Sequence, residues 1–234
     1  MDIIRQYLSS VLFPAHCAGC GQPTETQSLA IPNPALCPEC IERLERTEQF
    51  ALRNNLTEDL FAQNKQFERA ATFCFYDKQD LVSCLIQKAK YGRHPEINLE
   101  LARLAALDGL QSDFFEDIDV IIPIPLHTRR YKQRGYNQSD YIARGLNEIL
   151  HIPIDTTHIE RVRNNPQQAL TTGKERERNV ENIFAVNHPE EMYRKHILLV
   201  DDVITTGSTI RSCMEAMSAF RGVRISVFAL AKAR

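Results

Sequence analysis

The chain lacks three features that would each assign it to a broad class of protein. It has almost no net charge, because 28 Lys and Arg residues stand against 30 Asp and Glu residues, a formal charge of −2. This balance argues against a protein that coats nucleic acid through bulk positive charge. No apolar run is long enough to span a bilayer. The apolar N-terminal stretch is interrupted by Arg5 and Gln6, which disfavours a cleaved signal peptide and favours an amphipathic helix whose role stays open.

The composition is otherwise that of a soluble globular protein, with 43% hydrophobic and 25% charged residues among 234. Four of the seven cysteines fall within residues 17–40. An odd, clustered set does not resemble the paired disulfide framework of a secreted mini-protein, so the sequence predicts a reducing, cytoplasmic location. We expect two domains: residues 1–65 as a small cysteine module with a polar linker, and residues 66–234 as the larger domain.

The larger domain alternates short apolar segments with helical patterns, which predicts a parallel β-sheet covered by helices. The expected strands are residues 118–124, 158–162, 197–200 and 223–230, and the expected helices are residues 139–150 and 209–220. In the last helix the spacing i, i+3, i+4 predicts a buried face. That face consists of Ile210, Cys213, Met214, Met217 and Phe220. Cys74 and Cys84 lie in apolar patterns, and we expect both to be buried.

The cysteine cluster has the spacing of a metal site. Cys17, Cys20, Cys37 and Cys40 form the pattern C-x2-C-x16-C-x2-C, in which two tight turns can place four thiolates around one zinc ion. Four sulfur ligands complete the coordination shell, so such a site is structural rather than catalytic. Metal binding also explains how about fifty residues with little core can fold. The alternative is a pair of redox-active or disulfide-bonded CxxC motifs.

Residues 197–209 combine a buried strand, two adjacent carboxylates and a hydroxyl-rich loop that opens a helix. The loop residues are Thr205, Thr206, Gly207, Ser208 and Thr209, and the carboxylates are Asp201 and Asp202. Backbone N–H groups at a helix N-terminus, together with hydroxyl donors, form a cradle for a phosphate group. Paired carboxylates suit ribose hydroxyls and a magnesium ion. The alternative is an ordinary helix cap, which does not explain the paired acids.

Residues 200–209 resemble the phosphoribosyl-pyrophosphate motif of type I phosphoribosyltransferases, whereas the Walker pattern of nucleotide-binding loops is absent. The resemblance implies that Asp201 and Asp202 hold the ribose hydroxyls and that the loop from Thr205 to Thr209 holds the 5′-phosphate, with magnesium present. Purine-salvage members carry an acid as general base two residues before the loop glycine. Here that position is Thr205, which disfavours hypoxanthine or guanine salvage.

Further motifs resemble the ComF/GntX family of competence proteins over nearly the whole chain. They are the cysteine module after residues 12–14, Tyr76, and residues 90–92, 119–139, 167–170 and 176–184. Ile183 departs from the small residue that the family usually has before the Phe. The resemblance implies a type I phosphoribosyltransferase-like α/β domain preceded by a small zinc module. It also implies single-stranded DNA as a partner, and a ComFA-type helicase or DNA-processing proteins as further partners.

A basic collar surrounds the expected site. Leu126, His127 and Thr128 follow a strand and are expected to contact pyrophosphate. The remaining members are expected to form a basic face for DNA: Arg129, Arg130, Lys132, Arg134, Tyr136, Asn137, Gln138, Arg161, Arg163, Arg176 and Arg178. Residues 161–179 correspond to the mobile hood of phosphoribosyltransferases. The alternative for Arg129, Arg130 and Lys132 is a solvated loop face.

Three functions follow from these motifs. The first is a cytoplasmic accessory of natural transformation that handles incoming single-stranded DNA and binds phosphoribosyl pyrophosphate with magnesium. The second is an active phosphoribosyltransferase whose acceptor the sequence does not name. The third is a zinc-dependent interaction module whose former active site binds nothing, and the intact acids and loop count against it. The sequence leaves open the oligomeric state and whether DNA is contacted directly.

Overall fold

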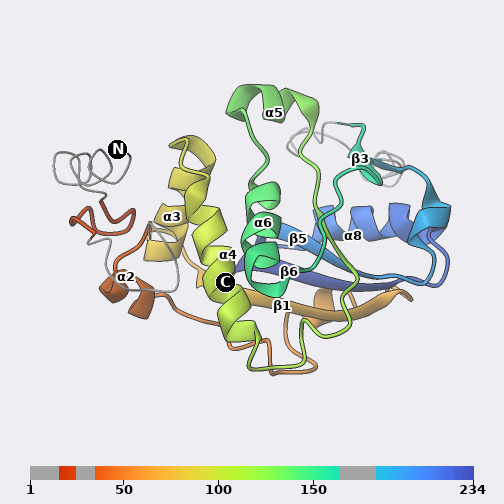
Figure 1. Ribbon diagram of the computed structural model, residues 1–234, viewed down its shortest axis with the longest axis horizontal. Helices are drawn as coiled ribbons and strands as arrows, with labels where there is room; N and C mark the ends of the chain where they lie inside the picture. Colours follow the sequence, from red (N-terminus) through yellow and green to blue (C-terminus); the bar gives the residue numbers. More distant parts are fainter. Residues whose placement is uncertain (1–15, 25–34, 164–182) are drawn as a thin grey trace, which may run out of the picture.

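The computed structural model describes residues 16–24, 35–163 and 183–234. Within this part of the chain, four parallel strands form a central sheet in the order β1-β6-β5-β2 (Figure 1). Their bounds are Phe67–Tyr76 for β1, Val120–Pro123 for β2, His196–Ile204 for β5 and Arg224–Ala233 for β6. A single bridge between Ile121 and Ile154 extends the sheet beyond β2 in the same direction. All carboxyl ends of these strands therefore lie at one edge.

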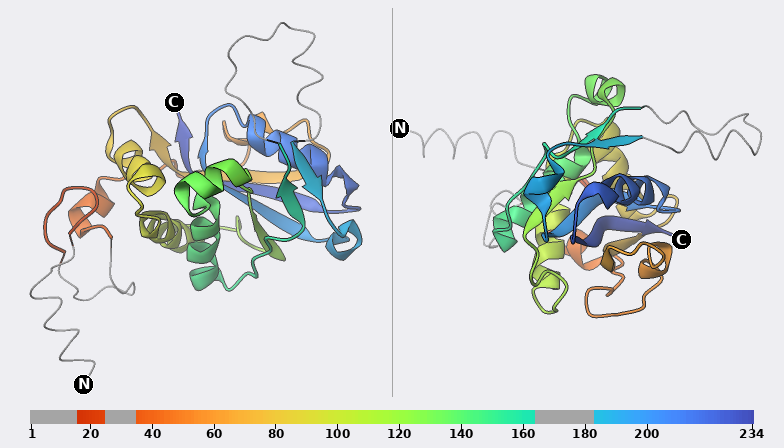
Figure 2. Two further views of the ribbon diagram at one scale, coloured as in Figure 1. Left: turned by 90° about the horizontal axis from the view of Figure 1, so that it is seen from above. Right: turned by 90° about the vertical axis from the view of Figure 1, so that its right-hand side faces the viewer.

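Helices cover both faces of the sheet, because successive residues of a buried strand point to opposite sides. Leu198 and Val200 belong to a core with α3 (Leu81–Tyr91), α4 (Glu96–Gly109) and α6 (Gln138–Leu150). Leu199 belongs to a second core with α8 (Ser208–Ala216), η3 (Met217–Ala219) and the two-stranded antiparallel sheet of β3 (Ile159–Arg161) and β4 (Phe184–Val186). The result is a three-layered α/β domain (Figure 2).

The remaining elements are short: α2 (Pro38–Glu42), η1 (Glu58–Leu60), α5 (Thr128–Arg134) and η2 (Pro189–Met192). The expected parallel sheet with flanking helices is confirmed, and each of the four expected strands and both expected helices is present with shifted ends. The placement of residues 158–162 in that sheet is wrong, because β3 pairs antiparallel with β4 in a separate two-stranded sheet. All five expected core residues of the last helix are at most 1% exposed. The burial of Cys74 is confirmed, but the prediction for Cys84 is wrong. Helix α3 buries Val82, Leu85, Ile86 and Ala89, which places Cys84 on its solvent side.

The cysteine module packs against α3 and α4 (Figure 1). Its residues Leu36, Cys40 and Leu44 belong to the same buried cluster as these helices. Lys88 on α3 donates through Nζ to the carbonyl oxygen of Ala18 at 2.6 Å. Glu100 on α4 is 2% exposed and accepts from the backbone N–H groups of Ala35 and Leu36. The module therefore shares a core with the sheet domain, while the domain boundary at residues 65/66 stays a prediction.

Residues 45–55, which lead into the polar stretch expected at residues 53–65, cover the open edge of β1. Backbone bonds join Thr47 N–H to the Phe73 carbonyl and Phe75 N–H to the Glu45 carbonyl, each at 2.9 Å. Further along, the Asn55 amide donates to the Ala70 carbonyl at 2.9 Å. An uncovered edge strand is a template for aggregation, so this segment completes the sheet.

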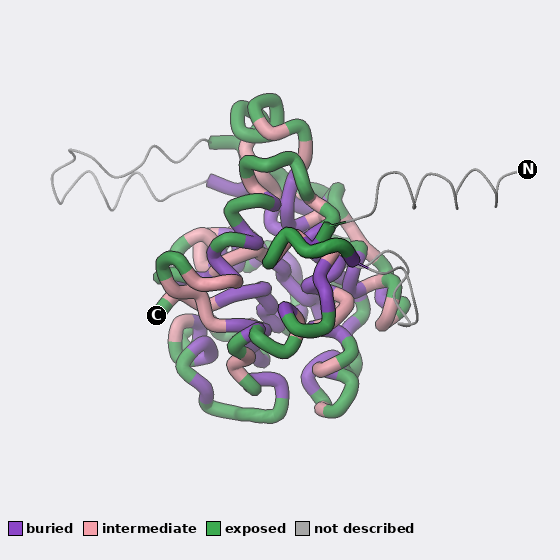
Figure 3. The backbone as a smooth tube through the Cα atoms, turned by 90° about the vertical axis from the view of Figure 1, so that its left-hand side faces the viewer, coloured by how far each residue is buried: buried purple, intermediate pink, exposed green. Residues whose placement is uncertain are grey.

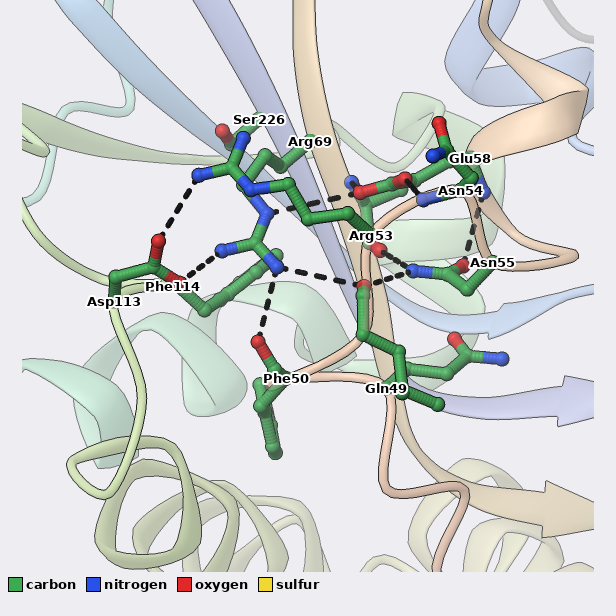
Figure 4. A network of polar contacts seen from close by, with 12 residues as sticks. Gln49, Phe50, Arg53, Asn54, Asn55, Glu58, Arg69, Asp113, Phe114 and Ser226 are labelled. Carbon is green, nitrogen blue, oxygen red and sulfur yellow. Dashed lines mark hydrogen bonds and ion pairs between the residues drawn. The ribbon is translucent and has the colours of Figure 1, made fainter.

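Arg69 lies at the centre of a polar network that fastens this segment (Figure 4). It is 3% exposed, forms ion pairs with Glu58 and Asp113, and donates to the Phe50 carbonyl oxygen at 3.0 Å. Its guanidinium also lies 5.4 Å from the ring centroid of Phe114. Three chain segments that are distant in sequence therefore meet on one buried cation.

We expect Arg69→Met to lower the free energy of unfolding by about 3 kcal/mol, because the buried Glu58 carboxylate and a carbonyl oxygen lose their partner. Arg53→Ala is the matched control. Arg53 pairs with the same Asp113 but has a side chain that is 58% exposed, so its removal costs less than about 1 kcal/mol. Urea unfolding of both variants measures the difference, and equal losses contradict the assignment.

Candidate functional site

Two carboxylates occupy the carboxyl end of the central strand β5. The Asp201 side chain accepts from the Ser139 hydroxyl at 3.3 Å, at the start of α6. The Asp202 carboxylate forms an ion pair with Lys90 Nζ of α3 at 2.9 Å, and both side chains are largely buried. Neither Lys90 nor Ser139 was predicted as a site residue. Both lie within the family-like segments, but their approach to the acids depends on how α3 and α6 pack.

The Asp201 carboxyl group has an unusual pKa. Burial and the neighbouring charge of Asp202 raise the pKa of Asp201 to about 7, although the Asp202 N–H group, Lys90 and Ser139 favour its ionised form. In the absence of a ligand, Asp201 is therefore largely protonated in slightly acidic solution. A ligand that brings hydroxyl donors or a cation would favour the ionised form.

The hydroxyl-rich loop lies beside Asp201. The two share one hollow, which is also lined by Thr205, Gly207, Ser208 and Thr209. Gly207 has φ = +72° and is the N-cap of α8, where it provides no side-chain cap. The Ser208 N–H group donates to Thr206 Oγ1 at 3.4 Å, and the N–H groups of a helix start also suit an anion. The phosphate cradle and the ordinary helix cap therefore both stay predictions.

The Phe61 ring lies against this loop at Gly207. A Cβ atom at Gly207 would lie 3.0 Å from Phe61 Cε1, so both the positive φ and the close approach favour glycine. Arg211 of α8 donates through Nη1 to the Leu60 carbonyl oxygen at 3.1 Å. The segment before β1 therefore contributes to the shape of the loop, which the sequence did not predict.

The predicted pyrophosphate loop follows β2, the strand next to β5. The Ile124 N–H group donates to the Val200 carbonyl at 2.9 Å, which aligns the ends of the two strands. Leu126 and His127 are partly buried, and Thr128 is exposed at the start of α5. His127 caps α5, because its Nδ1 accepts from the Arg129 N–H at 3.2 Å. This histidine thus has a local structural contact as well as its predicted role.

Arg161 of β3 is a cation close to Asp201, and its guanidinium lies 5.5 Å from the ring centroid of Phe184. Its pKa is lowered, first by burial and then by the charge of Arg130, while Asp201 opposes the shift. Its Nε is buried and has no hydrogen-bond partner among the described residues. Two arginines that repel each other beside one carboxyl group provide a site that an anion would complete.

The other members of the predicted basic face divide into two groups. Arg129, Arg130 and Lys132 are exposed on α5, at the top of the molecule (Figures 1 and 3). Asn137 and Gln138 are instead buried.

The contacts of Asn137 are structural, since its amide donates to the Ile124 carbonyl at 3.1 Å and to Asp140 at 2.8 Å. Arg163 is exposed beyond β3. Arg176 and Arg178, with most of the expected hood, lie outside the described residues.

The structure brings the four cysteines of the predicted metal site together. The Sγ atoms of Cys17, Cys20, Cys37 and Cys40 all lie within 4.8 Å of one another. Cys20 and Cys37 Sγ atoms are 3.7 Å apart, and Cys37 N–H donates to Cys17 Sγ at 3.3 Å. Sulfur atoms gathered at this spacing, with backbone donors around them, match the donor set of a soft divalent metal ion.

The thiols in this cluster differ in acidity. Burial opposes ionisation of Cys17, but backbone N–H groups of Cys20, Cys37 and Gly19 bring its pKa down to about 6. Burial raises the pKa of Cys37 and of Cys40. Metal binding would therefore displace protons from the buried thiols, which couples metal affinity to pH. Close packing of Gly19, where a Cβ would lie 2.8 Å from Cys40 Sγ, leaves no room for a larger residue.

Comparison with known proteins identifies the class of this domain. Residues 90–234 match the family model of the phosphoribosyl transferase domain. The match begins at Lys90 and contains both acids and the loop. The chain thus carries a phosphoribosyltransferase domain.

Three curated relatives identify the family more closely. Competence protein F of Haemophilus influenzae is 36% identical over 157 residues, covering 65% of this chain and 68% of that protein. DNA utilization protein YhgH of Escherichia coli O157:H7 is 33% identical over 154 residues, covering 64% and 67%. Competence protein ComFC of Bacillus subtilis is 27% identical over 204 residues, covering 83% and 68%. The chain belongs to the ComF-like family.

In residues 16–24, 35–163 and 183–234, no helix combines the length and apolar character that crossing a bilayer requires.

Proposed function

We propose that this chain is a cytoplasmic competence protein that handles incoming single-stranded DNA during natural transformation and binds phosphoribosyl pyrophosphate with magnesium. The observation that carries the proposal is the shared hollow of Asp201 and the loop from Thr205 to Thr209. The relatives named for competence and DNA utilization supply the cellular context. A ComFA-type helicase or DNA-processing proteins are the proposed partners in this process.

In the proposed complex, Asp201 and Asp202 hold the ribose hydroxyls, and the loop binds the 5′-phosphate through backbone and hydroxyl donors. The predicted pyrophosphate loop and Arg161 would neutralise the diphosphate group. Magnesium would supply further neutralisation of that charge. Lys90 would hold the Asp202 carboxylate in position through their ion pair at 2.9 Å.

An active phosphoribosyltransferase is the second candidate, and the intact acids and loop favour it. Such an enzyme transfers the phosphoribosyl group of phosphoribosyl pyrophosphate to an acceptor, so that the anomeric carbon bonds to the acceptor as its C–O bond to pyrophosphate breaks and pyrophosphate leaves. Thr205 is exposed and occupies the position of the usual purine-salvage base. A hydroxyl group does not act as a general base near neutral pH, so the acceptor would have to be nucleophilic without this help.

The cysteine cluster is proposed to bind one structural zinc ion through Cys17, Cys20, Cys37 and Cys40. A shell of four thiolates leaves no position for substrate or water. The contacts of Ala18 with Lys88 and of Leu36 with Glu100 transmit the order of the cluster to α3 and α4. Zinc would therefore stabilise the side of the domain that carries Lys90.

Isothermal titration calorimetry tests the nucleotide-precursor site. We expect phosphoribosyl pyrophosphate to release or absorb heat on binding in magnesium buffer, with weaker binding in EDTA. Ribose 5-phosphate, which lacks the diphosphate, serves as the matched ligand and should bind more weakly. No measurable binding of phosphoribosyl pyrophosphate with magnesium would contradict an intact pocket.

Fluorescence anisotropy with a labelled single strand at several salt concentrations tests the basic face. Arg129→Ala/Arg130→Ala/Lys132→Ala should weaken binding and flatten its salt dependence, since each lost phosphate contact reduces the slope of log affinity against log salt by about 0.7. Arg194→Ala/Arg221→Ala/Arg224→Ala removes three other exposed charges and is the control. Equal slopes in the two triple variants would contradict the assignment of this face.

A further inference from the structure

Two exposed tyrosines lie next to the basic helix and have no role in the site described above. Tyr91, the last residue of α3, is 73% exposed, and Tyr131 in the middle of α5 is 49% exposed. Large aromatic side chains at such exposure present a free ring surface to solvent. Their surroundings therefore decide what these rings can bind.

The surroundings of Tyr91 are cationic. Arg134, one turn after Tyr131 on α5, places its guanidinium 5.2 Å from the centroid of the Tyr91 ring. Arg129, Arg130 and Lys132 extend from the same helix, which contains no acidic residue. The acidic group closest in sequence to Tyr91 is Glu96, and it pairs with His94. The charge around the two rings is thus positive.

Tyr136 connects α5 to α3, and its own ring is packed rather than open to solvent. Its hydroxyl donates to the Ala89 carbonyl oxygen of α3, and its ring packs at 5.8 Å from that of Tyr141. The burial and contacts of Tyr136 also raise its pKa. Because Tyr136 joins the end of α5 to the end of α3, Arg134 and Tyr91 stay in register. Tyr136, which the sequence predicts in the basic face for DNA, therefore has a structural contact, and its exposed neighbours Tyr91 and Tyr131 are the rings open to a ligand.

We propose that Tyr91 and Tyr131 form a stacking platform for the bases of single-stranded DNA, with Arg134 and the α5 cations binding the strand's phosphates. This inference rests on the proposed function in DNA handling and names the residues that contact the bases. Aromatic rings beside cations bind single strands without sequence preference, because every base has a π-face and every nucleotide a phosphate. A duplex hides its base faces, so the platform selects single strands.

The test compares two labelled strands of equal length and charge, an oligothymidylate and an abasic strand, by fluorescence anisotropy. Tyr91→Ala and Tyr131→Ala should each weaken binding of the oligothymidylate roughly 5- to 100-fold, the range expected for loss of one stacked base. Binding of the abasic strand should change less than about twofold, because the phosphate contacts persist. Tyr91→Phe and Tyr131→Phe keep the ring and should retain affinity.

Tyr193→Ala is the matched control. Tyr193 is 60% exposed and also lies against an arginine, Arg194, at 5.8 Å from the ring centroid, but it follows η2, away from α5. The chain has 7 tyrosines and no tryptophan, so tyrosine fluorescence gives a second readout. Oligothymidylate should quench the wild-type signal, and the abasic strand should not.

The outcomes separate the two levels of the proposal. If the wild type binds the oligothymidylate but Tyr91→Ala and Tyr131→Ala bind it equally well, the stacking platform is wrong and the DNA-handling function stands. If both alanine variants lose the abasic strand as strongly as the oligothymidylate, the tyrosines act through structure rather than stacking. If the wild type binds neither strand, the proposed DNA contact fails, and the platform fails with it.

Discussion

Asp201→Asn is expected to make the ligand-free protein more stable at neutral pH while it removes binding of phosphoribosyl pyrophosphate. The reason is the cost of ionising a carboxyl group that is buried beside Asp202, which raises the pKa of Asp201 to about 7. Asparagine keeps the size and the hydrogen-bond acceptor for Ser139 but carries no charge. The ribose hydroxyls of the proposed ligand would lose a carboxylate acceptor.

The pH dependence has a definite sign. Because the pKa of Asp201 is higher in the folded than in the unfolded protein, the folded state binds this proton more tightly, and stability falls as pH rises. The loss begins near the unfolded pKa of about 4 and ends near the folded value, at about 1.4 kcal/mol per pKa unit. We therefore expect Asp201→Asn to gain about 2 to 4 kcal/mol over the wild type above pH 7 and little at pH 4.

Urea unfolding at pH values from 4 to 8, without magnesium or phosphate, measures this difference. Asp202→Asn is the comparison variant: it removes a charge that raises the pKa of Asp201 but also the partner of Lys90, so it should gain less stability than Asp201→Asn. A stability difference between Asp201→Asn and the wild type that does not grow with pH would contradict the buried-acid assignment. Calorimetry of both variants with phosphoribosyl pyrophosphate then shows whether the more stable variant has lost affinity for this ligand.

Cys40→Ser is expected to remove the metal and to destabilise the cysteine module. Cys40 is 1% exposed and belongs to the core that the module shares with α3 and α4. A serine hydroxyl is a poor zinc ligand compared with a thiolate, and metal binding contributes directly to the folding free energy of such modules. Elemental analysis should find about one zinc per wild-type chain and nearly none in the variant.

Cys84→Ser provides the matched control, because Cys84 is exposed on α3 and outside the cluster. Its metal content and thermal stability should equal those of the wild type. Wild-type metal content in Cys40→Ser would show that the four sulfur atoms do not form the site.

Removal of the metal is also expected to affect the site around Asp201 and Asp202. Helix α3 contacts the cysteine module through Lys88 and contacts Asp202 through Lys90. Disorder in the module would therefore weaken both contacts of this helix. A strong chelator should therefore weaken binding of phosphoribosyl pyrophosphate once magnesium has been restored. Circular dichroism must show that the sheet domain remains folded. Unchanged affinity after zinc loss would mean that the two sites act independently.

Much of the fold could be predicted from the sequence because local patterns are sufficient for it. Alternating apolar segments and helices predict a parallel sheet, and the spacing from Ile210 to Phe220 identifies a buried helix face. The cysteine spacing and the segment from Asp201 to Thr209 are likewise local, since each proposed site is built mainly from residues that are close in the sequence. These signals were enough to predict the class of the domain, and they name the residues of the two proposed sites.

Only the tertiary structure showed which distant residues complete these sites. Lys90 reaches Asp202 and Ser139 reaches Asp201 because α3 and α6 pack on one face of the sheet. Phe61 supports Gly207 from a segment that looks like a linker in the sequence. Tyr91 and Tyr131 are exposed, whereas Asn137 is buried. Composition does not reveal such differences, because exposure and ion pairing depend on how elements distant in sequence pack, and that packing minimises the burial of unpaired polar groups.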